Sequence, residues 1–484
     1  MKKFVAIILG IGFLHRLVLL GTRQLWVDEL MQARIIRFAS PAEILTRLRE
    51  GMDLASPLDF FVQKGLTVLL GDSAWALRLH AVVFGTLSIW IFYRVARFLF
   101  AERVARYATV LFAFYPLAYH YSQEARPYAL LMFLTLLSYD LLLRQLFGKD
   151  QRPRGWILIA GVLALLLYTS FLGALILCSQ LVCLALSVLL RPSPESPSGE
   201  GEAGEGSAGQ VSLEWSAVAW YGLAALAAFA LFFPWIRFVW ARPMLVPAAE
   251  ILDPKLILRL IKELGDNSYP AAALLLLGLA TGIRALLRHG RRQSLLWLLT
   301  WLLVPIPVLL AVEVWAGYFF AIRHILHVTP PLLLIAGYGL SYVGERLTIL
   351  PHLPYQLSSP AIAYAGILVL MSVYIGQSHA LNEPADWRGT AAFLSKSLRE
   401  GDAVSAPKVY PLLEYYYPEL AYFLIDDLDP GRGSLAGTGV QRRVVVCYDK
   451  MWPDACGGFR AAAVKDNAWG KVQFKAFTVF VRTR

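Results

Sequence analysis

The sequence predicts an α-helical polytopic membrane protein with a small α/β domain at its C-terminal end. Two observations predict this class. Of the 484 residues, 57% are hydrophobic and only 16% are charged, whereas soluble domains are about half apolar and about a quarter charged. The apolar residues also gather in runs close to 20 residues, about the length that crosses a bilayer as a helix. Most of the chain is therefore expected to lie in lipid.

About eleven apolar runs qualify as transmembrane helices. The first follows Met1-Lys2-Lys3 and has no small-residue cleavage site, so we interpret it as an uncleaved membrane helix. The stretch 156–190 is too long for one span and is expected to form two, which turn near Thr169-Ser170. The expected spans are residues 4–21, 76–98, 105–119, 128–146, 156–168, 173–190, 215–236, 271–287, 295–312, 325–343 and 361–377.

The positive charge of the chain predicts how these spans are oriented. The formal net charge is +11, and much of the Lys and Arg lies in short loops, as on the cytoplasmic side of membrane proteins. We therefore expect a multi-pass protein of the inner (plasma) membrane with a cytoplasmic N-terminus, and no nucleic-acid partner. An odd number of spans places the C-terminal domain and the long loop 22–75 outside the cytoplasm.

Three further segments complete the predicted organisation. Residues 1–381 are expected to form the transmembrane domain, in which the Pro, Ser, Gly and Glu tract at 191–212 is a disordered cytoplasmic loop. Residues 382–484 are expected to form the extracytoplasmic α/β domain, with a helix at 390–399 and strand-like runs at 403–405, 443–448 and 472–481. Cys447 and Cys456 lie in this domain, and the sequence leaves open whether they form a disulfide.

Polar groups on the outer side of the predicted membrane are candidates for chemistry. Asp28 and Glu29 follow the first span, where carboxylates are costly unless they face water, a cation or a substrate. Their plain alternative is an acidic pair at the start of a helix. Because adjacent helical residues point about 100° apart, only one of them can face a common cavity, and we favour Asp28.

Two more outer-face groups contain arginine. One is the segment 120–128, HYSQEARPY, with Glu124 and Arg126; its plain alternative is a surface ion pair. The other is the segment 318–324, YFFAIRH, in which Arg323 could instead reach the lipid headgroups. Together the groups supply a carboxylate for proton abstraction and two guanidiniums suited to a phosphate.

These segments resemble the bacterial GT-C glycosyltransferases, relatives of the dolichyl-phosphate-mannose protein mannosyltransferases and of the lipid A aminoarabinose transferase (a family 39-like group). The resemblance covers roughly residues 4–381 and extends to Asp386-Trp387-Arg388. YSQEARPYALLMFL at 121–134 is its most specific part. The other motifs that carry it are LWVDE after the first span, SPLDFF at 56–61, ALRL at 76–79 and IRHILHVTPPLLLIAGYGL at 322–340.

The resemblance implies a fold and an activity. The first external loop would form juxtamembrane helices over an active site, and the donor would be a sugar on a polyprenyl phosphate. It implies a catalytic role for Asp28, with Glu29 beside it, and donor-phosphate binding by Arg126 and Arg323. The residues we expect to position substrate are Glu124, Gln123, Tyr128 and His324. Where relatives often have two prolines, this chain has Ser56-Pro57-Leu58, a departure outside the expected chemistry.

The expected reaction is transfer of the sugar to a hydroxyl of a lipid, glycan or protein acceptor on the outer face. A single displacement inverts the anomeric centre. The phosphate leaves as an anion that arginines can stabilise without a metal, so no cofactor is expected and a divalent cation is left open. The sugar, the acceptor, the oligomeric state and the role of the C-terminal domain are not readable.

Three other functions compete with this interpretation. A secondary transporter or lipid flippase would also place acids and arginines in membrane helices, but no internal repeat is evident. Only the motif resemblance distinguishes the glycosyltransferase interpretation from an oligosaccharide polymerase or ligase. A receptor would not need eleven spans as an anchor.

Overall fold

The computed structural model divides into two compact units. Unit 1 comprises Met1–Leu20, Pro41–Gly71 and Ala76–Gln377, and unit 2 comprises Gly21–Ser40, Asp72–Trp75 and Ser378–Arg484. Two segments of the first long loop thus group with the C-terminal residues, which the sequence did not indicate. The described residues are 2–37, 40–53, 55–148, 152–190, 214–240, 256–266, 268–316, 322–344, 366, 385–406, 409–425, 440–449, 456–463 and 469–483.

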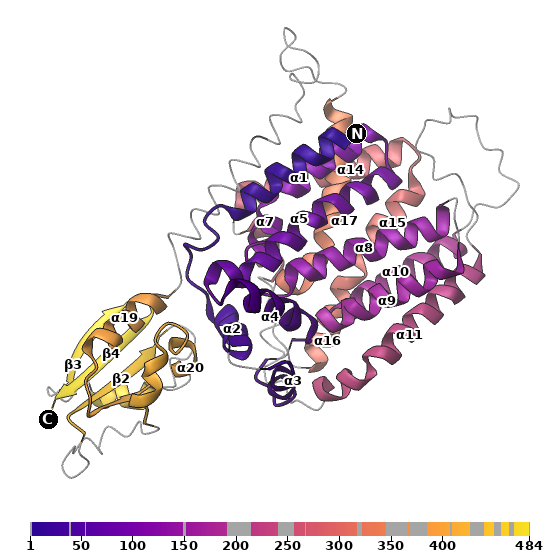
Figure 1. The fold of residues 1–484 in the computed structure, drawn as a ribbon. Helices are drawn as coiled ribbons and strands as arrows, with labels where there is room; N and C mark the ends of the chain where they lie inside the picture. The colour runs from indigo at the N-terminus through magenta and orange to yellow at the C-terminus, as the bar shows by residue number, and fades with distance from the viewer. Residues whose placement is uncertain are drawn as a thin grey trace, which may run out of the picture. The chain divides into compact units, whose positions relative to one another are not determined.

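The regular elements among the described residues of unit 1 are all helices, and these helices run side by side over much of their length (Figure 1). By length and composition, six of the described helices can cross a membrane, while α9 and α10 are shorter apolar helices. The bounds are α1 (Lys2–Leu17), α3 (Pro41–Arg49), α4 (Leu58–Leu70), α5 (Ala74–Leu99), α6 (Glu102–Phe114), α7 (Pro116–Tyr121), α8 (Tyr128–Phe147), α9 (Pro153–Thr169), α10 (Gly173–Leu189), α11 (Trp215–Trp240), α13 (Leu256–Leu264), α14 (Tyr269–Arg288), α15 (Arg292–Leu303), α16 (Pro305–Ala316), the 3-10 helix η1 (Ile322–Val328) and α17 (Thr329–Gly344).

The expected spans in the described residues agree with these helices, apart from one that is interrupted. The stretch 156–190 is two helices, α9 and α10, as expected. The span expected at 105–119 is interrupted at Tyr115, which is extended ahead of Pro116. Proline lacks the N–H for the helical ladder and clashes with the preceding turn. The spans expected at 295–312 and 325–343 each cover two helices, α15 with α16 and η1 with α17, and each pair is long and apolar enough to cross a membrane. The eleventh expected span and the tract 191–212 lie outside the described residues, save residue 366, and the number of crossings stays a prediction.

Glycines let α17 approach its neighbours closely. A Cβ on Gly337 would lie 2.5 Å from the Cβ of Ala108 in α6, and one on Gly339 would lie 2.5 Å from the backbone nitrogen of Gly282 in α14. Small residues at such crossings let helix backbones pack directly in a membrane. The AGYGL end of the motif at 322–340 is thus explained by packing.

Buried polar contacts join α4 to the start of α5. Nε2 of His80 lies 3.1 Å from Oδ1 of Asp59, and both side chains are fully buried. Gln63 donates to the carbonyl of Leu77 at 2.8 Å, and Arg78 donates to the carbonyl of Leu20 at 2.9 Å. Polar groups in SPLDFF and ALRL therefore fix this corner of unit 1, since a buried polar group is stable only when it is partnered.

Unit 2 contains a four-stranded mixed sheet in the order β1-β2-β4-β3. β1 and β2 are parallel, and the other two pairs are antiparallel. The strands are β1 (Asp402–Ser405), β2 (Arg442–Tyr448), β3 (Trp469–Phe474) and β4 (Phe477–Thr483); the helices are α2 (Val27–Arg37), α19 (Trp387–Ser397), α20 (Tyr410–Leu413), the 3-10 helix η2 (Pro418–Phe423) and α21 (Gly457–Ala463). The α/β class expected for the C-terminal residues is confirmed.

One detail of the predicted domain is wrong. The run 472–481 is not a single strand but parts of β3 and β4, because the chain reverses at Lys475-Ala476. Ala476 adopts the left-handed conformation, with φ of 64°. Two-residue hairpin turns usually carry Gly or Asn there, and Lys475-Ala476 contains neither.

Two features of the C-terminal residues are settled by packing. Asp386 caps α19 by accepting from the amide of Gly389 at 2.8 Å. The fully buried Trp387 packs edge-on against Phe477, with ring centroids 4.7 Å apart. Asp386 and Trp387 are therefore explained by a helix cap followed by a packed tryptophan.

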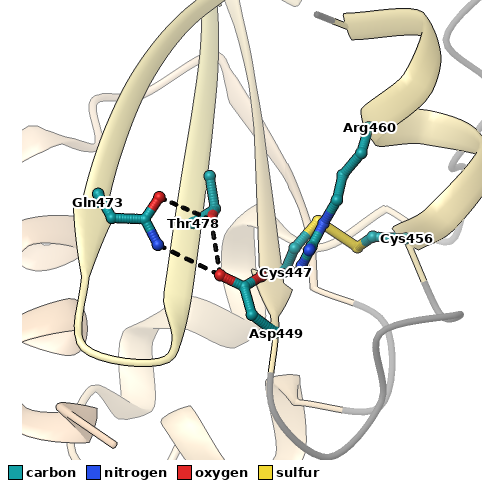
Figure 2. The surroundings of a disulfide bond; sticks show 6 residues. All are labelled: Cys447, Asp449, Cys456, Arg460, Gln473 and Thr478. Atoms are coloured by element: carbon teal, nitrogen blue, oxygen red, sulfur yellow. Dashed lines mark hydrogen bonds and ion pairs between the residues drawn. A yellow bond between two sulfur atoms is a disulfide. The ribbon is translucent and has the colours of Figure 1, made fainter.

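A disulfide joins Cys447 in β2 to Cys456 ahead of α21 (Figure 2). Beside it, Arg460 pairs with Asp449, whose other oxygen accepts from Thr478 in β4 at 2.8 Å. The sequence left the disulfide open, and the structure contains it.

Candidate active site

The most specific sequence motif forms a buried polar connection between α7 and α8. Pro127 lies at the N-cap of α8, where a proline costs no helical hydrogen bond. The residues Gln123, Glu124 and Arg126 are each less than a tenth exposed. Burying charged groups is costly unless they are paired and hydrogen-bonded, so the partners of these residues define what the segment can do.

Arg126 forms an ion pair across unit 1. Its Nη1 lies 2.7 Å from Oδ2 of Asp53, which comes from the loop between α3 and α4, and both side chains are nearly buried. Asp53 also accepts from the amide of Ala55 at 2.9 Å. The pair fixes the direction of the guanidinium, and Asp53 is a partner that the sequence analysis did not identify.

His120 lies between two carboxylates. Its Nε2 is 2.9 Å from Oε1 of Glu124, one turn on, and its Nδ1 is 3.1 Å from Oδ1 of Asp266, which follows α13. Although burial alone would lower it, Asp266 and Glu124 raise the pKa of His120 to about 10. The imidazole is therefore a cation at neutral pH, and this cluster of three balances part of the buried negative charge.

Glu124 keeps one oxygen available within this cluster. Among the described residues, its Oε2 is buried and has no hydrogen-bond partner, while Oε1 is held by His120. A buried acceptor of this kind usually marks a strained, catalytic or ligand-binding position. Sequence reasoning named Glu124 but missed Asp266, which follows α13 and adopts a positive φ of 52°.

Gln123 is used structurally. Its side-chain amide donates to the carbonyl of Arg16 at 2.9 Å and to that of Val18 at 2.7 Å. These carbonyls lie at the C-terminal end of α1, where helices leave carbonyl groups unsatisfied. Both donors of the amide are thus directed at α1, and the expected role in positioning substrate stays a prediction.

Aromatic residues of the motif lie beside the third expected group. The rings of Tyr121 and Tyr128 meet edge-on with centroids 5.0 Å apart, and Arg323 acts electrostatically on the Tyr121 hydroxyl. His324 is buried in η1. Tyr121, Tyr128 and Arg16 also line a small cavity. This cavity has room for about one water molecule.

Arg16 is a fully buried guanidinium on α1. Its Nη1 donates to the carbonyls of Gly12 and Ala113, at 3.1 and 3.0 Å. Its Nε and Nη2 have no hydrogen-bond partner among the described residues. The sequence analysis passed over Arg16 because it lies inside an expected span.

The expected acids lie on α2, in unit 2. Glu29 is fully buried and accepts from the amide of Trp26 at 3.2 Å, as an acid does when it caps the start of a helix. Asp28 is half-buried. Which of the two acids acts as the base stays a prediction.

The expected residues thus fall into two groups. Glu124, Arg126, Tyr128 and Arg323 belong to unit 1, and Asp28 with Glu29 belongs to unit 2. A joint site made from both groups stays a prediction. Within the described ranges, no group of three or more His, Cys, Asp or Glu is arranged to hold a metal ion; metal dependence is untested.

Comparison with known proteins places this architecture. The model of the family described as dolichyl-phosphate-mannose-protein mannosyltransferase matches residues 55–197. The structure of ArnT from Cupriavidus metallidurans bound to undecaprenyl phosphate superposes with a TM-score of 0.63 at 15% identity, covering 99% of this chain and 98% of ArnT. The chain has the GT-C fold.

The GT-C resemblance expected from the sequence is therefore confirmed at the level of fold. The oligosaccharyltransferase AglB from Archaeoglobus fulgidus, in complex with an inhibitory peptide and a dolichol-phosphate, superposes with a TM-score of 0.55 at 12% identity, covering 100% of this chain and 74% of AglB. No curated protein matches the sequence. The matched family and these GT-C neighbours include glycosyltransferases that handle polyprenyl-phosphate carriers.

Proposed function

We propose that the chain is a membrane glycosyltransferase that moves a sugar from a polyprenyl-phosphate donor to an acceptor hydroxyl on the outer face of the membrane. The observation that carries this proposal is the superposition over nearly the full length of both chains with a protein that binds undecaprenyl phosphate. The buried polar segment at 120–128 supports it, because its charged residues have the composition that a phosphate and a sugar need.

The proposed reaction is a single displacement. The acceptor oxygen attacks the anomeric carbon and forms the new C–O bond, while the bond from that carbon to the phosphate oxygen breaks. Asp28 takes the proton of the acceptor hydroxyl, and the carrier leaves as a phosphate monoester anion. Attack opposite to the leaving group inverts the anomeric centre.

Arg126 and Arg323 are proposed to stabilise the departing phosphate. Arg126 presents a guanidinium whose direction is set by Asp53, and a preoriented cation loses little free energy of reorganisation when charge develops on the leaving group. Glu124, whose Oε2 has no hydrogen-bond partner among the described residues, is suited to accept a hydrogen bond from a sugar hydroxyl. Which sugar and which acceptor are used is outside the proposal.

Asp28→Asn tests the proposal most directly. The purified wild type, Asp28→Asn and Glu29→Gln would be compared in nanodiscs for the release of undecaprenyl phosphate from a panel of radiolabelled undecaprenyl-phosphate sugars, with membrane lipids as acceptors. Glu50→Gln, an exposed acid, is the control.

We expect turnover of one donor by the wild type and by Glu50→Gln. Asp28→Asn should lose about 10³-fold or more in kcat, since loss of a general base removes at least 10²-fold. Equal activity of Asp28→Asn and the wild type would exclude Asp28 as the base. A wild type that binds no undecaprenyl phosphate at all would exclude the transferase proposal and favour transport.

A further inference from the structure

The segment that carries Asp28 is bound to the C-terminal residues just before α2 begins. The backbone amide of Leu25 donates to the hydroxyl of Tyr416 at 2.9 Å. Gln24 accepts from the backbone amide of Arg388 at 2.8 Å and lies 3.4 Å from Asp386 through its amide nitrogen. Arg388 also donates through Nη1 to the carbonyl of Thr22 at 3.1 Å.

A second group of contacts binds the other end of α2. Arg37 donates through Nη1 to the carbonyl of Tyr415 at 2.9 Å, and its Nε lies 2.6 Å from Asp72. The hydroxyl of Tyr415 donates to the backbone carbonyl of Asp72 at 2.7 Å. Arg34 lies 3.9 Å from Glu414. Residues 72–75 are thus bound into the same structure as α2.

These contacts decide where α2 points. A helix of eleven residues has little stability of its own in water, so its position depends on tertiary contacts. Leu25, Leu30 and Ile36 have no exposed surface, and α2 packs against α20. Two of the polar contacts reach the backbone at 22–25, directly ahead of the turn that bears Asp28, and the side chain of Gln24 adds two more, so together they fix the direction in which this turn starts.

We propose that the C-terminal domain positions the catalytic acid, with Tyr416 and Arg388 as positioning residues that hold the segment 22–25 and thereby aim Asp28. The proposal rests on the proposed function, because it assumes that Asp28 is the base. It assigns the domain a role in turnover, and it requires no substrate contact by Tyr416 or Arg388. Loss of the contacts retains the carboxylate of Asp28 but leaves its orientation less well defined.

The test compares Tyr416→Phe, Arg388→Ala and the double variant with two matched controls. Tyr416→Phe keeps the ring and removes only the hydroxyl that Leu25 donates to. The controls are Tyr422→Phe, at a ring that is 87% exposed, and Arg399→Ala, at another exposed arginine of the same domain. Each protein in nanodiscs is assayed for kcat, for affinity for undecaprenyl phosphate, and for hydrogen exchange at the amides of residues 25–30.

We expect kcat to fall about 10-fold in each single variant and about 100-fold in the double variant, since small misplacement of a catalytic group costs rates of this order. Affinity for undecaprenyl phosphate should stay within about twofold, because the proposed phosphate ligands lie elsewhere in the chain. Exchange at residues 25–30 should become faster, and both controls should behave as the wild type.

Two results would overturn the proposal: unchanged exchange in the double variant, or faster exchange with unchanged kcat. Failure of the proposed function looks different. In that case the wild type binds no undecaprenyl phosphate, or Asp28→Asn is as active as the wild type, whereas the exchange of residues 25–30 still reports whether Tyr416 and Arg388 hold the segment.

Discussion

His120 shows how a buried charge cluster is balanced residue by residue. The imidazole lies within 3.1 Å of both Glu124 and Asp266, so the charged form of His120 offsets two carboxylates that burial would otherwise disfavour. His120 belongs to a segment that the sequence already indicated, directly ahead of the motif at 121–134. Its partner Asp266 lies 146 positions away, and no local pattern connects positions so distant.

The cluster predicts a pH dependence of stability. The pKa of His120 is raised to about 10 in the folded protein, against about 6.5 in an unfolded chain. Its stabilising contribution is therefore complete below about pH 6.5, declines as pH rises, and is lost above about pH 10. The thermal midpoint of the wild type in detergent should exceed that of His120→Gln at pH 6.5, and the difference should vanish by about pH 10. A constant difference across this range would contradict the assignment.

Gln123 offers a second test at this scale. Gln123→Ala removes both hydrogen bonds to the end of α1 and leaves the buried carbonyl of Arg16 and the part-buried carbonyl of Val18 without this donor, at a cost of about 1–3 kcal/mol. We expect a lower thermal midpoint with unchanged affinity for undecaprenyl phosphate. Gln293→Ala, at an exposed glutamine, is the control. Weaker binding at an unchanged midpoint would instead support the predicted role of Gln123 in positioning substrate.

At the scale of elements, α5 and the connection after α7 are in contact at one glycine. A Cβ on Gly85 would lie 2.2 Å from Oγ of Ser122 and 3.4 Å from Nε of Arg16. Ser122 lies in the same segment as Glu124 and Arg126, and its hydroxyl donates to the carbonyl of Ala118. This helix can therefore carry no larger residue at position 85 without displacing the motif.

A pair of substitutions tests this contact. Gly85→Ala should cost about 1–3 kcal/mol through overpacking and should lower glycosyl transfer, because the displaced segment carries Glu124 and Arg126. Ser122→Gly in the same chain removes the side chain that a new Cβ would meet, so the double variant should recover much of both losses. Gly161→Ala, at a glycine with open space around it, is the control. Additive losses in the double variant would refute the steric explanation.

The elements also show which predictions a sequence supports. Runs of apolar residues predicted the helices at 76–98 and 128–146 well. A membrane helix makes its backbone hydrogen bonds within itself, and its apolar composition can be recognised in the sequence. The hairpin at 472–481 was missed because Lys475-Ala476 has no turn chemistry. Short elements depend on tertiary contacts that leave little local trace.

For the whole molecule, the fold could be predicted from the sequence, but the division of the chain into its two units could not. The motifs indicated a GT-C fold, which the comparison with ArnT confirms. The grouping of residues 21–40 with the C-terminal residues depends on contacts between positions more than 360 apart, such as Leu25 with Tyr416. The candidate site was likewise predicted as separate motifs, whereas partners such as Asp53 and Asp266 appeared only in three dimensions.

The last prediction concerns the compartment of the C-terminal domain. A disulfide between Cys447 and Cys456 persists in an oxidising compartment and is rare in the cytosol, so it supports the expected external location. In intact cells that express Cys178→Ala Cys183→Ala, which lacks the two free cysteines of α10, a maleimide should label no thiol after denaturation unless a reductant is added first. Labelling of both thiols without reductant would place the domain in a reducing compartment and contradict the predicted topology. Cys447→Ser in the same background leaves one free thiol and is the positive control for labelling. Closing a loop of this length stabilises a domain by about 2–3 kcal/mol. The Cys447→Ser variant should therefore also unfold at a lower temperature.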